Sequence, residues 1–163
     1  MHKNFNETYH FIDKFKEADL IKKIKKFCRK TNRKFYLANE IKLAFNLGLD
    51  GAYIPSFNNS YNHISYSKRI NFRLIGSAHN LKEIIIKNNQ NVDIVFLSPI
   101  FKTKKSIKFL GLYRFIYLKN LTKQKVIALG GINNANYKKI KLTKCYGIAS
   151  ISSIKNLYDS GSS

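Results

Sequence analysis

The chain has 163 residues, of which 44% are apolar, and this size and composition predict one globular domain over residues 1–163 with a disordered tail at 158–163. No apolar run approaches the roughly 20 residues that cross a bilayer, and residues 1–9 lack the apolar stretch of a secretory signal, so we expect a cytoplasmic protein. Thirty Lys and Arg against nine Asp and Glu give a net charge of +21, which leaves few carboxylates for chemistry that needs paired acids.

Short β-rich runs alternate with amphipathic segments along the chain. The β-rich runs combine branched and aromatic residues, and they cover residues 9–15, 34–38, 51–55, 72–77, 92–98, 126–130 and 147–152. Between them, apolar side chains recur at helical spacing in residues 20–27, 40–47, 110–121 and 135–142. Asn39, where the run 34–38 meets the segment 40–47, has the chemistry of a helix N-cap.

The repetition of strand, helix and strand predicts parallel pairing with right-handed crossovers, and hence an α/β fold. A repeat of about 15 to 30 residues fits either a (β/α) barrel or a doubly wound sheet. In both architectures the binding groups gather in the loops at the C-terminal ends of the strands. Polar or glycine-rich segments follow several runs, including residues 76–79 and 130–133, so we expect the site there.

Two neighbouring runs near the C-terminus end in small residues and lead into helical segments. Residues 126–133 contain Gly130 and Gly131, and residues 147–154 contain Ile151 and Ser152. Two glycines let backbone N–H groups approach an anion closely, and helix N-termini add the positive ends of their dipoles. The two segments together predict a phosphate site. The alternative is a pair of tight turns in which glycine serves the backbone geometry alone.

A third segment, residues 93–103, opens from a buried run into a basic loop. This loop carries Thr103, Lys104 and Lys105, which could close over a diphosphate. The competing interpretation is an ordinary solvated loop, and the residues of the loop by themselves favour it.

The order of these segments resembles the thiamine phosphate synthase and thiazole tautomerase superfamily. Four motifs follow one another in the family's order: Ser77-Ala78-His79, Ser98-Pro99-Ile100-Phe101-Lys102-Thr103, Ala128-Leu129-Gly130-Gly131-Ile132, and Gly147-Ile148-Ala149 with Ser152 and Ile154. With similar runs upstream, the resemblance spans roughly residues 34 to 154. It implies a (β/α)8-type TIM barrel. Only seven β-rich runs are visible, so we expect the barrel to lack one N-terminal βα unit and its open edge to be covered by a homodimer or by the N-terminal segment.

The resemblance also implies an activity and roles for the candidate residues. The family joins hydroxymethylpyrimidine diphosphate to thiazole phosphate in thiamine biosynthesis, a transferase reaction that releases pyrophosphate. The thiazole phosphate is expected at Gly130, Gly131, Ile151 and Ser152. The pyrimidine diphosphate is expected at Asn39, Ser77, Thr103, Lys104 and Lys105. His79 is expected to be a scaffold group, and no residue is assigned a catalytic role.

Magnesium is the family's cofactor, and two departures from the family pattern fall on its ligands. Glu40 stands where the family has an Asp after the Asn, and Asn58 is the nearest equivalent of a second Asp. Mg²⁺ favours hard anionic oxygens in near-ideal octahedral geometry, so an amide in place of a carboxylate should weaken the site. We therefore expect Glu40 and Asn58 to form a weak magnesium site, or none. Pro99 stands where the tautomerase branch has a catalytic His, which argues against that activity.

Two functional hypotheses stay open. The first is a thiamine phosphate synthase-like enzyme with a weakened magnesium and diphosphate site. The second is a non-catalytic member of the family that binds a phosphorylated ligand as a sensor, carrier or partner protein. The charge of +21 raises a third, a nucleic-acid binder, but the Lys residues are spread along the chain and no reader motif is recognisable. We expect a phosphorylated small molecule as the partner, and no specific nucleic acid or membrane.

Overall fold

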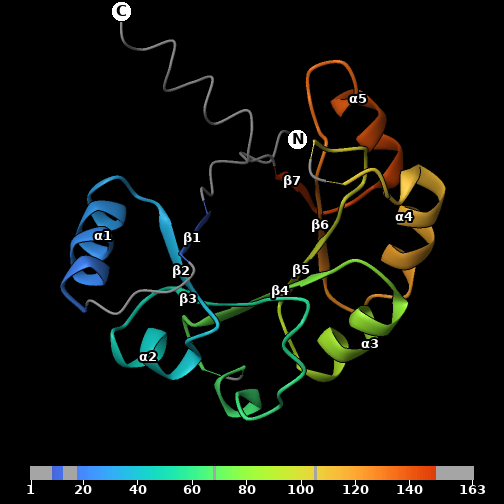
Figure 1. The fold of residues 1–163 in the computed structure, drawn as a ribbon. Helices are drawn as coiled ribbons and strands as arrows, with labels where there is room; N and C mark the ends of the chain where they lie inside the picture. Colours follow the sequence, from blue (N-terminus) through green and yellow to red (C-terminus); the bar gives the residue numbers. More distant parts are fainter. Residues whose placement is uncertain (1–8, 13–17, 68, 105, 150–163) are drawn as a thin grey trace, which may run out of the picture. The chain divides into compact units, whose positions relative to one another are not determined.

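The structure of the chain is a computed structural model, which describes residues 9–12, 18–67, 69–104 and 106–149 (Figure 1). Internal contacts divide the chain into two compact units. The first unit comprises Met1–Gly76 with Asn89–Asp93, and the second comprises Ser77–Asn88 with Ile94–Ser163. The single domain over residues 1–163 stays a prediction, and the tail at 158–163 lies outside the described residues.

The first unit is built from parallel strands and two helices. Its elements in chain order are β1 (Tyr9–Ile12), α1 (Ala18–Lys30), β2 (Lys34–Ala38), α2 (Ile41–Asn46), β3 (Gly51–Ile54), the 3₁₀ turn η1 (Ile64–Tyr66) and the first residues of β4 (Arg73–Ala78). β1 pairs with β2, β2 with β3 and β3 with β4, all in parallel. Helix α1 packs against β2, and α2 packs against β2 and β3 (Figure 1).

Burial explains why these segments take these forms. β2 begins with the exposed Lys34 and continues with four buried residues, the unbroken apolar run of a strand that is covered on both faces. In α1, the buried Ile21 and Cys28 lie two helical turns apart and therefore share a face. The exposed positions of the same helix are filled by lysine at residues 22, 23 and 26. The apolar spacing thus sets the inner face of α1.

The second unit repeats this pattern after the last residues of β4. Its elements are α3 (Leu81–Asn89), β5 (Ile94–Leu97), α4 (Gly111–Asn120), β6 (Lys125–Leu129), α5 (Tyr137–Ile140), the 3₁₀ turn η2 (Lys141–Thr143) and β7 (Gly147–Ala149). β5 pairs with β6 and β6 with β7, both in parallel. All four residues of β5 are buried. The described residues thus confirm an α/β fold with parallel strands, while closure into a TIM barrel stays a prediction.

The expected elements agree closely with the observed ones. Each of the seven β-rich runs overlaps a strand, and each of the four expected helical segments overlaps a helix, within the described part of the chain. In the run 9–15 the strand ends at Ile12, and in the run 147–152 it ends at Ala149. The remaining residues of both runs lie outside the described residues.

Helix α3 was not among the segments with helical spacing. Its N-terminus is a capping box, in which Asn80 Oδ1 accepts a hydrogen bond from the N–H of Glu83 at 3.0 Å. The Glu83 carboxylate accepts two bonds in return, from the Asn80 side chain and from the N–H of His79, both at 2.7 Å. These contacts fix the start of α3 directly after β4.

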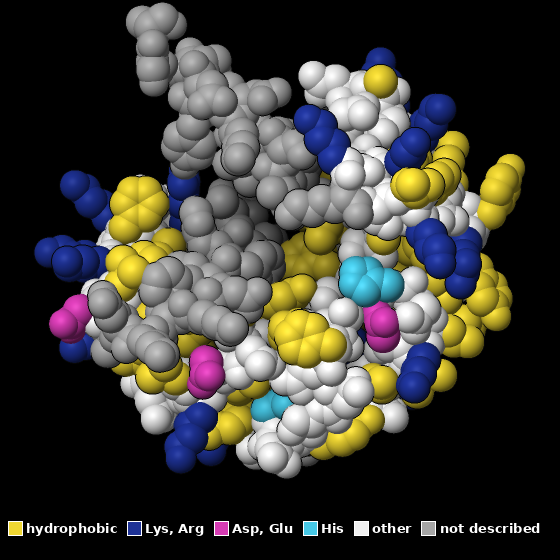
Figure 2. Space-filling view, in the orientation of Figure 1, with side chains coloured by type: hydrophobic (Ala, Val, Ile, Leu, Met, Phe, Trp, Pro, Cys, Tyr) yellow, Lys and Arg dark blue, Asp and Glu magenta, His cyan; other side chains and the backbone are white. Residues whose placement is uncertain are grey.

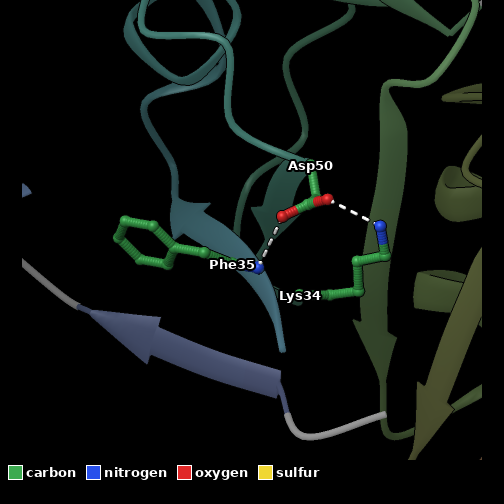
Figure 3. A network of polar contacts seen from close by, with 3 residues as sticks. All are labelled: Lys34, Phe35 and Asp50. Atoms are coloured by element: carbon green, nitrogen blue, oxygen red, sulfur yellow. Dashed lines mark hydrogen bonds and ion pairs between the residues drawn. The ribbon is translucent and has the colours of Figure 1, made fainter. Parts of the chain in front are cut away.

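Two aspartates connect neighbouring strands at their N-terminal ends. Asp50 lies immediately before β3, and its Oδ2 accepts a hydrogen bond from the N–H of Phe35 in β2 at 2.9 Å. Its Oδ1 accepts one from Lys34 Nζ, also at 2.9 Å, so both carboxylate oxygens are engaged (Figure 3). Similarly, Asp93 Oδ2 accepts a hydrogen bond from the N–H of Leu74 in β4 at 2.8 Å. Each carboxylate therefore accepts a hydrogen bond from a strand N–H that would otherwise lack an acceptor at the end of the sheet.

Asp50→Ala is expected to lower the free energy of unfolding by about 1–2 kcal/mol, because the N–H of the buried Phe35 would lose its acceptor. Asp50→Asn keeps an acceptor oxygen and loses only the partly exposed ion pair with Lys34, so it should cost less than about 1 kcal/mol. Urea unfolding of the three proteins measures both changes. Equal losses for the two variants would mean that the ion pair, and not the strand N–H, carries the effect.

Basic side chains of the described residues are visible at several places on the surface. In the view of Figure 2, Lys and Arg side chains stand out from described parts of the chain in more than one group. This distribution agrees with the spacing of the lysines along the sequence. Among the described residues, no helix has the length and apolar character needed to cross a membrane.

Candidate functional site

The loops after β5 and β6 pack directly against each other. Gly130 and Gly131 follow β6 with left-handed φ angles of +96° and +69°, a region that favours glycine. A Cβ atom on Gly130 would lie 2.6 Å from Pro99 Cβ, and one on Gly131 would lie 2.6 Å from the carbonyl oxygen of Phe101 and closer still to that of Lys102. The backbone of residues 99–102 therefore occupies the space that side chains on the two glycines would fill.

Backbone hydrogen bonds hold the two loops together. The N–H of Ile100 donates to the carbonyl of Leu129 at 3.0 Å, and the N–H of Phe101 donates to that of Gly130 at 3.1 Å. These bonds continue the β5–β6 pairing beyond the strand ends. Two further backbone bonds, of 2.9 and 3.0 Å, bring the chain back from residues 110–111 to residues 99–100. The loop that carries Thr103 is thus closed at its base.

This packing shows one role of the glycines. The sequence left open whether they serve an anion or the turn geometry, and the structure gives them a definite structural task, the close approach of residues 99–102. Within the described residues the N–H of Gly131 has no acceptor, while its carbonyl accepts a bond from Asn136 Nδ2 at 2.8 Å. The phosphate role of Gly130 and Gly131 stays a prediction. Ile151 and Ser152, their expected partners, lie outside the described residues.

His79 is held at the end of β4 by the strand beside it. Its Nδ1 lies 2.7 Å from the carbonyl oxygen of Ser98 and 3.2 Å from the Ser98 hydroxyl. A carbonyl can only accept, so Nδ1 carries the proton in this contact. The contact agrees with the interpretation of His79 as a scaffold group. Ser77, two residues earlier, is buried in β4 with only 4% of its surface exposed.

The basic loop after β5 is ordered by its own turn. Thr103 Oγ1 accepts a hydrogen bond from the N–H of Ser106 at 2.9 Å, and the N–H of Thr103 donates to the Ser106 carbonyl at 3.1 Å. Lys104 lies within this turn and is exposed, while Lys105 lies outside the described residues. The turn therefore engages Thr103 internally and presents the Lys104 ammonium group to solvent.

Asn39 follows β2 in a left-handed conformation, with a φ angle of +60°. Its N–H donates to the carbonyl of Tyr53 at 2.8 Å, and its Oδ1 accepts a hydrogen bond from Asn58 Nδ2 at 2.5 Å. The expected N-cap role of Asn39 is wrong, because the residue at the N-cap of α2 is Glu40 and no side chain caps that helix. The amide of Asn39 is turned instead toward the loop after β3.

That loop is anchored by a residue that the sequence did not single out. Gln90 is fully buried, and its Nε2 donates to the carbonyl of Asn58 at 2.9 Å and to that of Ser60 at 2.8 Å. The side chain of Asn58 is also engaged, since its Oδ1 accepts a bond from the N–H of Ser60 at 2.8 Å. The structure thus brings Asn39 and Asn58 together, and Gln90 positions the segment that carries Asn58.

These groups fit magnesium poorly. Glu40 is exposed. The loop after β3 contains no Asp or Glu, and Asn58 in that loop offers only an amide. The Oδ1 of Asn58 already accepts a backbone N–H, and its Nδ2 faces Asn39. The described residues contain no group of three or more His, Cys, Asp and Glu that could hold a metal ion. As the side chains stand, they do not form the hard, anionic cage that Mg²⁺ favours.

The candidate residues are divided between the two units. Asn39, Glu40 and Asn58 belong to the first unit, and all of them follow the C-terminal ends of β2 and β3. In the second unit, Ser77 lies near the C-terminal end of β4, while the other candidates follow β5 or β6; these are Thr103, Lys104, Gly130 and Gly131. Fold and site together define an α/β protein whose candidate binding groups lie at the C-terminal ends of parallel strands.

Comparison with known proteins identifies the family within this class. A family model described as thiamine monophosphate synthase matches residues 11–154, so the chain belongs to that family. The thiamine-phosphate synthase of Persephonella marina is 28% identical over 145 residues, which cover 86% of this chain and 66% of that protein. The thiamine-phosphate synthase of Methanococcus vannielii is 28% identical over 141 residues, which cover 84% of this chain and 67% of that protein. The chain thus spans about two thirds of the length of these curated relatives.

A solved structure has a similar fold. The thiamine phosphate pyrophosphorylase from Pyrococcus furiosus has a TM-score of 0.67 at 19% sequence identity, and the match covers 88% of this chain and 70% of that chain. At this identity the likeness concerns the fold. It agrees with the α/β architecture and the parallel strands of both units.

Proposed function

We propose that this chain acts in thiamine biosynthesis as a thiamine phosphate synthase-like transferase whose magnesium and diphosphate site is weakened. The supporting observation is the pairing of the loops after β5 and β6, which carry two of the family's motifs and pack on each other at the C-terminal ends of the strands. Membership of the family supports the same role.

In the proposed reaction, the ring nitrogen of thiazole phosphate attacks the methylene carbon of hydroxymethylpyrimidine diphosphate. The C–N bond forms as the C–O bond to the diphosphate breaks, and the electron pair of that bond leaves with pyrophosphate. The nitrogen attacks with its own lone pair, so no proton has to be removed from it. The protein must therefore align the two substrates and stabilise the negative charge of the leaving group.

The residues of the two loops suit these tasks. Lys104 is exposed on an ordered turn, where an ammonium group can approach the leaving diphosphate. We place the thiazole phosphate near the N–H groups of Gly130 and Gly131, with Ile151 and Ser152 completing that site. Asn39 and Ser77 would hold the pyrimidine, and Lys105 would assist Lys104. Bound magnesium would neutralise charge on the diphosphate, but no step is assigned to it because the residues present fit it poorly.

A non-catalytic role is the second candidate, and one observation favours it. Asn58 stands where a carboxylate is expected, and both ends of its side-chain amide are engaged by Asn39 and Ser60. A chain that retains the loops for a phosphate ester but neutralises diphosphate poorly would bind its ligand without turning it over. Such a protein would serve as a phosphate-ligand sensor, carrier or partner protein.

Assay of the purified chain distinguishes the two. With both substrates present, we expect slow formation of thiamine phosphate and pyrophosphate, with a rate that rises as magnesium is raised. Binding of both substrates without product at any magnesium concentration would favour the non-catalytic role. Failure to bind either substrate would remove both proposals.

Lys104→Ala should lower kcat/KM for the pyrimidine diphosphate about tenfold or more, as expected for the loss of one charge-assisted contact worth about 1.5–3 kcal/mol. Lys108→Ala is the matched control, because Lys108 is an exposed lysine in the same loop region. Steady-state kinetics of both variants give the comparison. If Lys108→Ala costs as much as Lys104→Ala, the loop acts through its overall charge and Lys104 has no special contact.

A further inference from the structure

The first unit contains a cavity at the opposite end of its strands from Asn39 and Asn58. It has a volume of about 260 Å³ and lies between the last turns of α1, the start of β2 and the segment just before β3. A cavity of this size is smaller than a typical site for a drug-sized ligand, and it suits a small molecule.

The walls of this cavity are strongly basic. Among the described residues, four cationic side chains and one carboxylate line it: Lys25, Arg29, Arg33 and Lys34, with Asp50. The carboxylate is already neutralised, because one Asp50 oxygen lies 2.9 Å from Lys34 Nζ and the other accepts the N–H of Phe35 at 2.9 Å (Figure 3). Four cations less one carboxylate leave three net positive charges around about 260 Å³.

Two of these cations, Lys25 and Arg33, each contact a neighbouring group of the first unit. Lys25 Nζ donates to the carbonyl of Leu47 at 2.5 Å, which positions the ammonium group without cancelling its charge. The guanidinium of Arg33 lies over the ring of Phe27, 5.8 Å from its centroid. Asn32, two residues after the end of α1, has a left-handed φ of +52°, as is common where a helix ends.

The floor of the cavity carries no negative charge that would oppose an anion. Cys28 is buried there, and its pKa is raised, first by burial and second by the nearby Asp50 carboxylate, so the thiol stays protonated at neutral pH. The carbonyls at the C-terminal end of α1 are also engaged, since that of Cys28 accepts the N–H of Arg33 at 2.8 Å and that of Phe27 accepts the N–H of Thr31 at 3.0 Å.

We propose that this cavity is a second binding site, specific for a small, multiply charged phosphate anion of about the size of diphosphate. Two guanidinium groups supply the planar forks that pair with phosphate oxygens, and Lys25 adds a third charge. The site uses none of the residues assigned to the proposed reaction, and it lies at the N-terminal ends of β2 and β3, away from their loops at the other end. It therefore stands or falls independently of the transferase activity.

Titration calorimetry with inorganic pyrophosphate, in EDTA and at low ionic strength, tests the site in the full-length chain. Arg29→Gln with Arg33→Gln should weaken pyrophosphate binding at least tenfold, and Gln keeps much of each side chain's apolar stem. The control is Lys23→Gln with Lys26→Gln, which removes the same two charges from exposed positions of α1 that do not line the cavity. This control should change the Kd less than twofold.

A third variant separates this cavity from the candidate site of the second unit. Lys104→Ala should leave the cavity's pyrophosphate binding unchanged. If pyrophosphate binding is lost in Lys104→Ala and kept in the Arg29 and Arg33 variant, the anion binds at the reaction site and the proposal is overturned. Equal weakening in the cavity and control variants would also overturn it, since the effect would then come from the overall charge. Circular dichroism before titration confirms that each variant is folded.

Discussion

Gly131→Ala is expected to lower the free energy of unfolding by about 3 kcal/mol. The added Cβ would lie 2.6 Å from the Phe101 carbonyl oxygen and closer to that of Lys102, and these are backbone atoms that cannot rotate away. The φ of +69° adds backbone strain for any residue with a Cβ. Overpacking and strain each cost about 1–3 kcal/mol, and the two act together here.

Gly111→Ala is the matched control for this prediction. Gly111 has a similar φ of +71°, but among the described residues no atom outside its chain neighbours and its own helix backbone lies within 4 Å of the Cβ that alanine would add. It should cost only the backbone strain, about 1 kcal/mol. Urea unfolding of both variants isolates the clash. If Gly131→Ala is no more destabilising than Gly111→Ala, residues 99–102 move aside freely and the two loops are not held together as the structure shows.

The same geometry limits how phosphate binding can be tested. A substitution at Gly131 disturbs the protein's own backbone before any ligand arrives, so loss of binding in such a variant would not locate a phosphate. A bulky residue at Gly131 would therefore disturb the two loops as well as any ligand bound there. Lys104 is the better position for a functional test, because it is exposed and its substitution removes a charge without a clash.

The strands could be predicted because a strand that is buried on both faces appears in the sequence as a short, continuous run of apolar residues. The run 34–38 matches β2 to the residue, since Lys34 is exposed and the four residues after it are buried. Helix α3 was missed for the opposite reason. Its isoleucines are consecutive, at residues 84–86, and give no helical spacing, although only Ile84 is fully buried and Ile85 is half exposed. The capping box from Asn80 to Glu83 was the local signal that could have found it.

The candidate site was predictable only at the level of single motifs. Asn39 was expected at the diphosphate and Asn58 at the magnesium ion, and neither motif predicts the hydrogen bond between their amides, which are 19 residues apart in the chain. The role of Gln90 could not be predicted from the sequence, because it depends on the burial of this side chain beneath a loop that lies 30 residues earlier in the chain. Contacts of this kind are set by tertiary packing, and neither spacing nor propensity records them.

Asn58→Asp is expected to raise the affinity for hydroxymethylpyrimidine diphosphate about tenfold in the presence of magnesium. A carboxylate at position 58 would join Glu40 as a hard anionic ligand, which is the donor type that Mg²⁺ favours. The local contacts can adapt, because the N–H of Ser60 can still donate to an oxygen at position 58 and the amide of Asn39 can turn its Nδ2 toward the new carboxylate. Without magnesium the added negative charge should leave the affinity unchanged or slightly lower it.

Asn59→Asp is the control for this change, since Asn59 is the adjacent, exposed residue and gains the same charge. Titration calorimetry of both variants, with magnesium and with EDTA, gives four affinities that separate a ligand effect from a charge effect. A gain confined to Asn58→Asp with magnesium would mark position 58 as a metal ligand position whose carboxylate this chain has lost. If the two variants respond alike, or if the gain persists in EDTA, position 58 does not face the metal, and the weakness of the diphosphate site must have another cause.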